Sequence, residues 1–136
     1  MMTKEEKQLL LIDLCVRLPY GVICRLSAKD ADVSITEKLE IGGLEHFISG
    51  TMDVKPYLRP LSSMTEEEEE SLREDTGLDI FKCTVNKELE DLWATDCSVK
   101  DLFCLCSWLN KYHFDYNGLI EKGLALEAPK DMYKTE

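Results

Sequence analysis

The sequence has no cluster of basic residues. Its 136 residues include 16 Lys and Arg against 27 Asp and Glu, so the formal net charge is −11. Proteins that bind nucleic acid or anionic membrane surfaces depend on clustered Lys and Arg, which neutralise phosphate groups. The sequence therefore predicts no direct binding to nucleic acid and no binding to a membrane.

A long apolar run is also missing. The apolar run at residues 9–12 is far short of the roughly 20 residues that span a bilayer. Two glutamates stand beside the lysines near the N-terminus, and no small-residue cleavage site follows, so we expect no secretory signal. These absences lead us to expect a cytoplasmic protein.

The six cysteines form no Cys-x-x-Cys motif, the spacing that is typical of zinc ligands. They stand at positions 15, 24, 83, 97, 104 and 106. A cytoplasmic compartment keeps thiols reduced, and nothing marks any of them as a nucleophile activated by His46 or His113. We expect free, mostly buried thiols, no metal and no cofactor.

The composition is that of a globular domain, with 44% hydrophobic and 32% charged residues. Strand patterns come early in the chain and helix patterns late, which predicts an α+β fold rather than an alternating α/β fold. We expect one domain over residues 1–128, with a small antiparallel sheet at 20–49 and helices on one of its faces. Residues 129–136 look like a loose polar tail.

Alternation of apolar and polar residues predicts the strands. Residues 20–27 would bury alternate side chains, namely Val22, Cys24 and Leu26. The clearest alternation follows at 33–41, where Val33 and Ile35 should face the core. The Gly42–Gly43 pair then suggests a tight hairpin, with 44–49 as the returning strand. Weaker patterns suggest further strands at 78–85 and 124–127.

Two long helices frame this sheet in the prediction. The first opens with a capping box at Thr3 and Glu6 and ends at Pro19, and its thin polar stripe includes Asp13 and Arg17. The strongest helix follows Ser98, and we expect it to form the core together with the first helix and the sheet. Its predicted buried face contains Val99, Leu102, Phe103, Cys106, Leu109 and His113. A short helix is expected at 86–94.

Residues 54–76 join the two halves. Pro56 and Pro60 remove backbone donors, so residues 55–61 should lie along an edge or at the surface. An acidic helix should follow, opened by a capping box of either Ser63 with Glu66 or Thr65 with Glu68. Residues 65–76 contain seven acidic residues and one basic residue, so more than half of the excess negative charge lies in this helix.

Three stretches of the chain look familiar together. They are 13–24 (DLCVRLPYGVIC), 54–68 (VKPYLRPLSSMTEEE) and 108–129 (WLNKYHFDYNGLIEKGLALEAP). In this order they resemble a group of short, uncharacterised proteins found in gut Bacteroidales and in their phages and prophages. The resemblance implies a bacterial or phage cytoplasm, and it brings no activity and no catalytic residues.

The exposed junction is the first candidate site. Arg and Tyr are enriched at binding hot spots, and a run of carboxylates suits a basic partner. We therefore predict a non-enzymatic adaptor or inhibitor that binds another protein, without excluding self-association. The predicted contact residues are Tyr57, Arg59, Glu66, Glu67, Glu68, Glu69 and Glu70. The alternative is a structural brace, in which Arg59 forms ion pairs with nearby carboxylates of the same chain.

A second candidate site combines His113, Asp115 and Tyr116, which fall within four residues at a helix end. As an active site they would supply acid–base groups for an enzyme of unknown reaction. As structural residues, His113 would favour the negative end of the helix and the aromatic rings would pack. No nucleophile is specified nearby, which favours the structural alternative. An acidic mimic of nucleic acid is a third hypothesis, although the bunching of the carboxylates on one helix counts against it.

Overall fold

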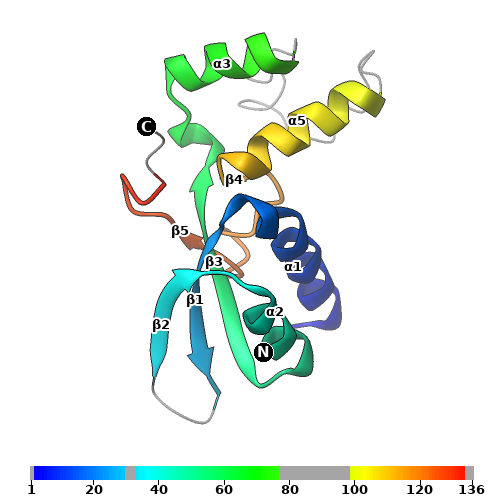
Figure 1. Ribbon diagram of the computed structural model, residues 1–136, viewed down its shortest axis with the longest axis vertical. Helices are drawn as coiled ribbons and strands as arrows, with labels where there is room; N and C mark the ends of the chain where they lie inside the picture. Colours follow the sequence, from blue (N-terminus) through cyan, green and yellow to red (C-terminus); the bar gives the residue numbers. More distant parts are fainter. Residues whose placement is uncertain (1, 30–32, 77–98, 134–136) are drawn as a thin grey trace. The chain divides into compact units, whose positions relative to one another are not determined.

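The computed structural model describes residues 2–29, 33–76 and 99–133, with side chains omitted at 76 and at 99–102 (Figure 1). Helices and a small mixed sheet make up the chain, which confirms the predicted α+β class. The chain divides into two compact units. Unit 1 comprises Met1–Leu58 with Asn117–Glu136, and unit 2 comprises Arg59–Tyr116.

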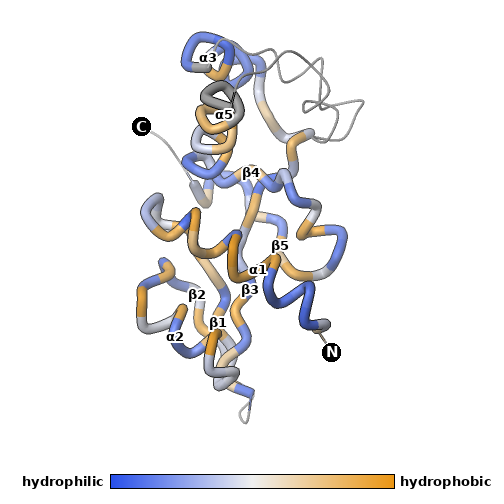
Figure 2. Tube along the Cα trace, turned by 90° about the vertical axis from the view of Figure 1, so that its right-hand side faces the viewer, coloured by the Kyte–Doolittle hydropathy of each residue, from blue (hydrophilic) through white to orange (hydrophobic). Residues whose placement is uncertain are grey.

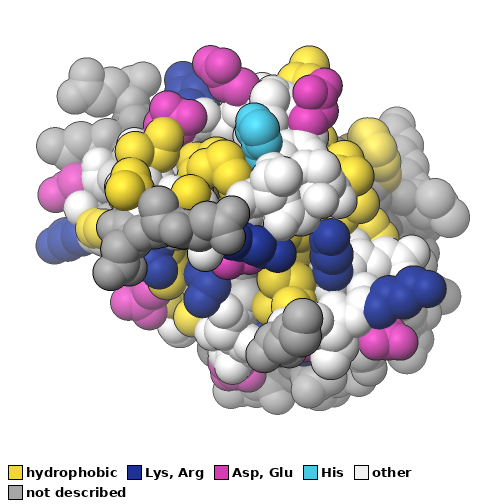
Figure 3. Space-filling view, turned by 90° about the horizontal axis from the view of Figure 1, so that it is seen from below, with side chains coloured by type: hydrophobic (Ala, Val, Ile, Leu, Met, Phe, Trp, Pro, Cys, Tyr) yellow, Lys and Arg dark blue, Asp and Glu magenta, His cyan; other side chains and the backbone are white. Residues whose placement is uncertain are grey.

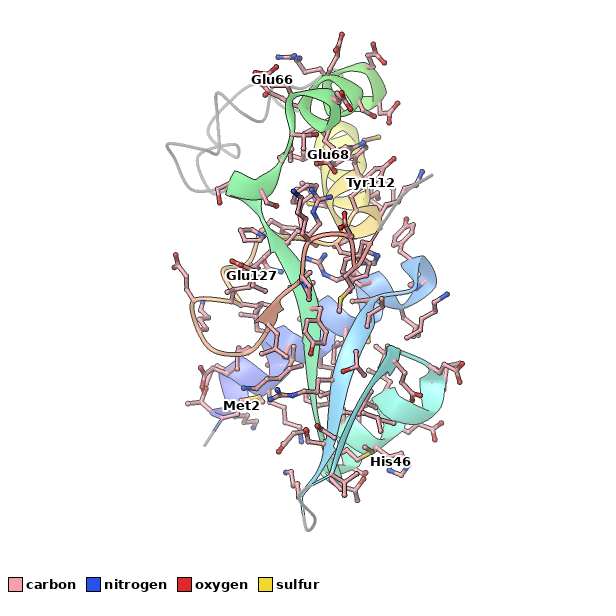
Figure 4. All side chains as sticks on the ribbon, turned by 90° about the vertical axis from the view of Figure 1, so that its left-hand side faces the viewer. Met2, His46, Glu66, Glu68, Tyr112 and Glu127 are labelled. Carbon is pink, nitrogen blue, oxygen red and sulfur yellow. The ribbon has the colours of Figure 1, made fainter. Side chains whose placement is uncertain are left out.

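Unit 1 is built on a twisted sheet. Its elements in chain order are α1 (Lys4–Arg17), the 3-10 turn η1 (Leu18–Tyr20), β1 (Ile23–Ala28), β2 (Ser34–Lys38), α2 (Ile41–Ser49), most of β3 (Met52–Pro60) and β5 (Leu126–Glu127). Strand β1 pairs with β2 and β3 in antiparallel fashion, as predicted, whereas β5 adds a short parallel pair to β3. Figures 1 and 4 show α1 and α2 on the same face of these strands.

Helix α1 begins as predicted. The Thr3 hydroxyl accepts from the Glu6 amide at 3.1 Å, and the Glu6 carboxylate accepts from the Thr3 amide at 2.9 Å. The burial pattern of the helix differs from the prediction, because the polar stripe faces the core and part of the apolar surface is exposed. Asp13 and Arg17 are fully buried and form an ion pair of 2.9 Å, while Ile12 is 54% exposed. The pair shares the inner face with Leu10 and Leu14 through i,i+3 and i,i+4 spacing, and mutual neutralisation allows both charges to leave water.

Strand β1 buries Val22, Cys24 and Leu26, as its alternation predicts. The predicted burial of Val33 and Ile35 is wrong, because they are 62% and 48% exposed. Strand β2 is an edge strand, and all five of its residues are exposed. Alternation reports which side chains share a face, and it does not report whether another element covers that face.

Residues 41–49 form helix α2, so the predicted hairpin with a returning strand is wrong. The helix follows Glu40 and ends at Gly50, whose φ of 80° is the left-handed conformation common after a helix. Gly43 serves packing rather than a turn, because a Cβ there would lie 3.1 Å from Leu26 Cδ2. The missing side chain lets α2 lie close against β1.

The proline-containing strand β3 is interior to the sheet, and the predicted edge position of 55–61 is wrong. Pro56 is buried and ends the antiparallel pairing, opposite Cys24. The parallel pairing with β5 begins at the next residue, Tyr57, and Pro60 closes the strand opposite Asp115. Both prolines therefore stand where pairing changes or stops, which is where a missing amide is tolerated.

Unit 2 has its own buried cluster. Its elements are the end of β3, the 3-10 turn η2 (Leu61–Ser63), α3 (Glu66–Thr76), α5 (Val99–Lys111) and β4 (Phe114–Asp115), which runs parallel to β3. The buried residues are Met64, Leu72, Leu105, Trp108, Leu109 and Phe114. Helix α5 thus supplies buried side chains to this cluster and not to the cluster of unit 1 that α1 joins. Phe103, predicted to be buried, is 72% exposed.

In Figure 2, α5 is largely hydrophobic in colour, β1 and β3 alternate between hydrophobic and hydrophilic residues, and α3 is mainly hydrophilic. The strand and helix predicted at 78–85 and 86–94 lie outside the described residues, while the predicted strand at 124–127 corresponds to β5. Within the described ranges, no helix is long and apolar enough to cross a membrane.

The expected C-terminal tail contains an anchoring residue. The Tyr133 hydroxyl accepts from the Ile23 amide at 2.8 Å and donates to the Tyr57 carbonyl at 2.7 Å. Burial raises the pKa of this phenol, against a smaller lowering by the Ile23 hydrogen bond. Tyr133 therefore links β1 to β3 just beyond the point where their pairing ends.

Candidate functional site

Arg59, a predicted contact residue, is held inside unit 2. Its guanidinium donates two hydrogen bonds to the Glu68 carboxylate, at 2.6 and 2.7 Å, and lies 4.3 Å from the centroid of the Phe114 ring. Its amide donates to the His113 carbonyl at 2.8 Å. Figure 4 shows Glu68 between α3 and the end of β3. This geometry agrees with the structural brace, because both terminal nitrogens of the Arg59 guanidinium already donate to Glu68. We call this paired contact the Arg59–Glu68 fork.

Glu68 also completes the cap of α3. The Thr65 hydroxyl accepts from the Glu68 amide and the Glu68 carboxylate accepts from the Thr65 amide, both at 3.1 Å. Burial acts to raise the pKa of Glu68, but the hydrogen bonds from Arg59 and Thr65 outweigh it and hold the pKa below its ordinary value. Of the two predicted capping boxes, Thr65 with Glu68 forms. The Ser63 hydroxyl donates to the Pro60 carbonyl at 2.7 Å instead.

The other carboxylates of the glutamate run 66–70 divide into two kinds. Glu69 pairs with Arg73 at 3.3 Å, the i,i+4 contact that the sequence suggests. Glu66, Glu67 and Glu70 are exposed and form no ion pair with any residue in the described parts of the chain. These three define what we call the acidic face of α3. Tyr57 lies in unit 1, where it is partly buried.

Asn110, which no sequence pattern singled out, accepts hydrogen bonds from both His113 and Tyr116 of the second candidate site. His113 is 4% exposed with a φ of 62°, and its amide donates to the Asn110 carbonyl at 3.1 Å, which closes the end of α5. The Tyr116 hydroxyl donates to the Asn110 side-chain oxygen at 2.7 Å. Asp115 lies in β4, opposite Pro60. These contacts serve the helix end and the sheet, as the structural alternative predicts.

A groove in unit 1 was missed altogether by the sequence reasoning. It has a volume of about 800 Å³, and among the residues that the structure describes, five cationic side chains and two carboxylates line it. The cations are Lys7, Arg25, Lys29, Lys55 and Lys122, and the carboxylates are Glu6 and Asp53. Figure 3 shows Lys and Arg side chains gathered on one face, with hydrophobic side chains between them. We call this site the basic groove.

The basic groove corrects the inference that the chain has no basic cluster. Its cations come from α1, β1, the residue after β1, β3 and the turn before β5, so they span positions 7 to 122. Pairing of β1 with β3 places Arg25 directly opposite Lys55. Strand register together with the packing of α1 and the turn before β5 brings these charges together, and a linear scan for basic runs cannot detect that.

The described thiols differ in exposure. Cys15 is exposed, Cys24 is buried, and Cys104 and Cys106 are intermediate; Cys83 and Cys97 lie outside the described residues. Burial, with a smaller contribution from the Asp13 charge, raises the pKa of Cys24 to about 12, and burial also raises the pKa of Cys106. Among the described residues, no group of His, Cys, Asp and Glu is placed to hold a metal ion.

Comparison with protein-family models, with curated proteins and with solved structures finds no match to this chain. Function therefore has to come from the geometry of the side chains themselves.

Proposed function

We propose that this chain is a non-enzymatic binding protein of a bacterial or phage cytoplasm, which binds a basic segment of another protein on the acidic face of α3. The observation that supports the proposal is that some glutamates of the run form ion pairs within unit 2 while others are exposed and unpaired in the described parts of the chain. Glu68 and Glu69 are in ion pairs inside unit 2, while Glu66, Glu67 and Glu70 are exposed. The first group fixes the helix, and the second remains available to a partner.

A cationic partner would relieve a local repulsion. Glu66 and Glu70 stand four residues apart on one helix, and such like-charged pairs cost a few tenths of a kcal/mol. An external Lys or Arg near both carboxylates would remove that cost. Exposed charge pairs alone contribute only about 0.2–1 kcal/mol, so charge cannot supply the whole affinity.

An exposed aromatic ring on the neighbouring helix adds apolar surface. Phe103 on α5 is 72% exposed, and α5 packs against α3 through Leu72, Leu105 and Leu109. Large aromatic side chains dominate binding energy at protein interfaces. We therefore expect the bound segment to carry apolar side chains beside its basic ones, as an amphipathic basic helix does.

The Arg59–Glu68 fork would prepare the helix for binding. A helix of 11 residues is marginal when isolated, because its nucleation is costly. The Thr65 cap and the Arg59–Glu68 fork hold the first turn of α3 in place. Binding therefore loses less free energy to ordering the helix. In this proposal Arg59 positions the acidic face, and Tyr57, which lies in unit 1, stays a separate predicted contact.

The test uses a fluorescent amphipathic peptide of lysine and leucine as the basic probe, with anisotropy as the readout. Changing Glu66, Glu67 and Glu70 together to glutamine should weaken binding at least tenfold. The matched control changes Glu37, Glu40 and Glu45, which are exposed in unit 1, to glutamine. An equal loss in the control would show that net charge alone attracts the peptide and would refute the assigned surface.

Salt and Phe103 separate the two parts of the contact. Raising the salt concentration from about 0.01 M to about 0.15 M shortens the Debye length from about 30 Å to about 8 Å and should weaken the wild-type complex. The glutamine triple variant should respond less to salt. Phe103→Ser should weaken binding by a factor that changes little with salt, because apolar burial is not screened. Unchanged binding in both variants would contradict the proposal.

A further inference from the structure

In the basic groove, two positively charged residues are paired directly across neighbouring strands. Arg25 and Lys55 are direct partners across β1 and β3, so their side chains stand on the same face of the sheet. Like charges in this arrangement destabilise a strand pair. A chain with 27 acidic residues could have placed a carboxylate at either position. The arrangement is explained if an anion from outside bridges the two cations.

The carboxylates of the groove neutralise only part of its positive charge, since Asp53 pairs with Lys29 and Glu6 interacts with Lys122. The Glu6 carboxylate accepts from the Thr3 amide in the cap of α1, and Asp53 lies 3.9 Å from Lys29. Lys7, Arg25, Lys55 and Lys122 form no ion pair with any residue that the structure describes. The groove therefore keeps an excess of positive charge within a strongly acidic chain.

Apolar side chains line the same groove. Met2, Phe47 and Leu124 contribute to its wall, and Lys7 Nζ lies 5.7 Å from the centroid of the Phe47 ring. Figure 4 shows Met2 beside the first half of β3. The volume of about 800 Å³ falls within the range of small-molecule sites, which combine apolar walls with a few charged groups.

We infer that the basic groove binds a compact organic anion with an apolar body and a phosphate-type head, such as an aryl or alkyl phosphate monoester. At neutral pH this head carries about −1.5 to −2 charges and three acceptor oxygens. Arg25 and Lys55 would bind the head, since they face each other across the strands. Met2 and Met52, which line the groove and are only partly buried, would contact the body.

A long polyanion fits the surroundings less well. Screening limits the favourable potential of the groove to about 8–10 Å. A polymer would extend beyond that distance over a unit whose exposed surface includes Glu37, Glu40 and Glu45. Phosphates outside the groove would then meet these carboxylates as well as scattered lysines such as Lys38 and Lys130, so the balance favours a ligand that ends within the groove.

Titration calorimetry with 1-naphthyl phosphate tests the inference on the full chain. Changing Arg25 and Lys55 together to glutamine should weaken binding at least tenfold, because both charge-assisted contacts to the head are lost. The matched control changes Lys38 and Lys130, two exposed lysines outside the groove, to glutamine and should stay within about twofold of wild type. The Arg25 and Lys55 variant should melt no lower than wild type without ligand, because a repulsive pair has been removed.

Two further probes define the ligand class. Pyrophosphate, which has the charge without the apolar body, should bind more weakly than 1-naphthyl phosphate, and a short single-stranded DNA should bind more weakly still. Failure of 1-naphthyl phosphate to bind, or an equal loss in the lysine control, would overturn the inference. Tighter binding of the DNA would assign the groove to a polymer instead. The glutamine variant of α3 should leave these affinities unchanged, so this inference and the proposed function can fail separately.

Discussion

Units 1 and 2 concentrate charge in opposite ways. In unit 2 the acidic residues are consecutive in sequence, and one helix presents Glu66, Glu67 and Glu70 together. In unit 1 the basic residues are scattered along the chain, and strand pairing brings Arg25 opposite Lys55. A sequence therefore reveals a charged helix directly, whereas a charged groove built on a sheet emerges only once the register is known.

The two units also use arginine differently. Arg17 of unit 1 is fully buried with Asp13, whereas Arg59 of unit 2 is about one-fifth exposed in its fork with Glu68. Removing one partner of a buried ion pair leaves an uncompensated charge in the interior, while a partly exposed partner can return to water. The difference predicts unequal costs for similar substitutions.

The largest expected effect is in unit 1. Arg17→Met should lower the free energy of unfolding by about 3–5 kcal/mol, because the Asp13 carboxylate stays buried without its cation. Urea denaturation measures the change. The double variant Asp13→Leu with Arg17→Met should regain much of the loss, since an apolar pair replaces the buried charges. A cost below about 1 kcal/mol for the single change would show that water reaches the pair.

Thiol labelling compares the packing of the two units. Cys24 in the core of unit 1 should react on the order of a hundredfold more slowly than the exposed Cys15, because the thiolate is the reactive species and burial raises the pKa of Cys24 to about 12. Cys106 in unit 2 should react at an intermediate rate. Pulsed alkylation with peptide mapping gives the three rates. Equal rates for Cys24 and Cys15 would mean that unit 1 opens readily.

A smaller effect is expected for the fork of unit 2. Glu68→Gln should cost about 1 kcal/mol at pH 7, against almost nothing for the exposed Glu67→Gln. The folded pKa of Glu68 lies below its ordinary value of 4.5, so its contribution is complete above that pH and is lost as pH falls through the folded pKa. Thermal melts between pH 7 and about pH 3 should show the two curves converging. A constant separation would exclude Glu68 as the titrating group.

Local signals in the sequence were dependable. The capping boxes at Thr3 and Thr65 form as predicted, because a cap involves only residues three apart. The alternation of Val22, Cys24 and Leu26 was also sufficient to identify the buried face of β1, because β1 lies between two strands and a helix covers that face. The α+β class followed from the order of such signals along the chain.

Signals that depend on distant partners failed. Gly43 looked like a hairpin residue because its actual role, close packing on Leu26, involves a residue 17 positions away. Arg17 looked like part of a polar stripe because its burial with Asp13 depends on distant residues such as Asn117, whose side chain donates to Asp13 at 3.3 Å. The brace at Arg59 was foreseen as an alternative, since Glu68 is near in sequence, whereas the cations of the basic groove come from four separate segments of the chain.

The most direct test of the account is a reciprocal binding experiment on the full chain, with the lysine–leucine peptide and 1-naphthyl phosphate as paired probes. The variant with glutamine at 66, 67 and 70 should lose the peptide at least tenfold and keep the phosphate within about twofold. The variant with glutamine at 25 and 55 should do the reverse, because each variant leaves unchanged the residues that bind the other probe. Loss of both probes in either variant, or of neither in both, would contradict two separate binding surfaces of opposite charge.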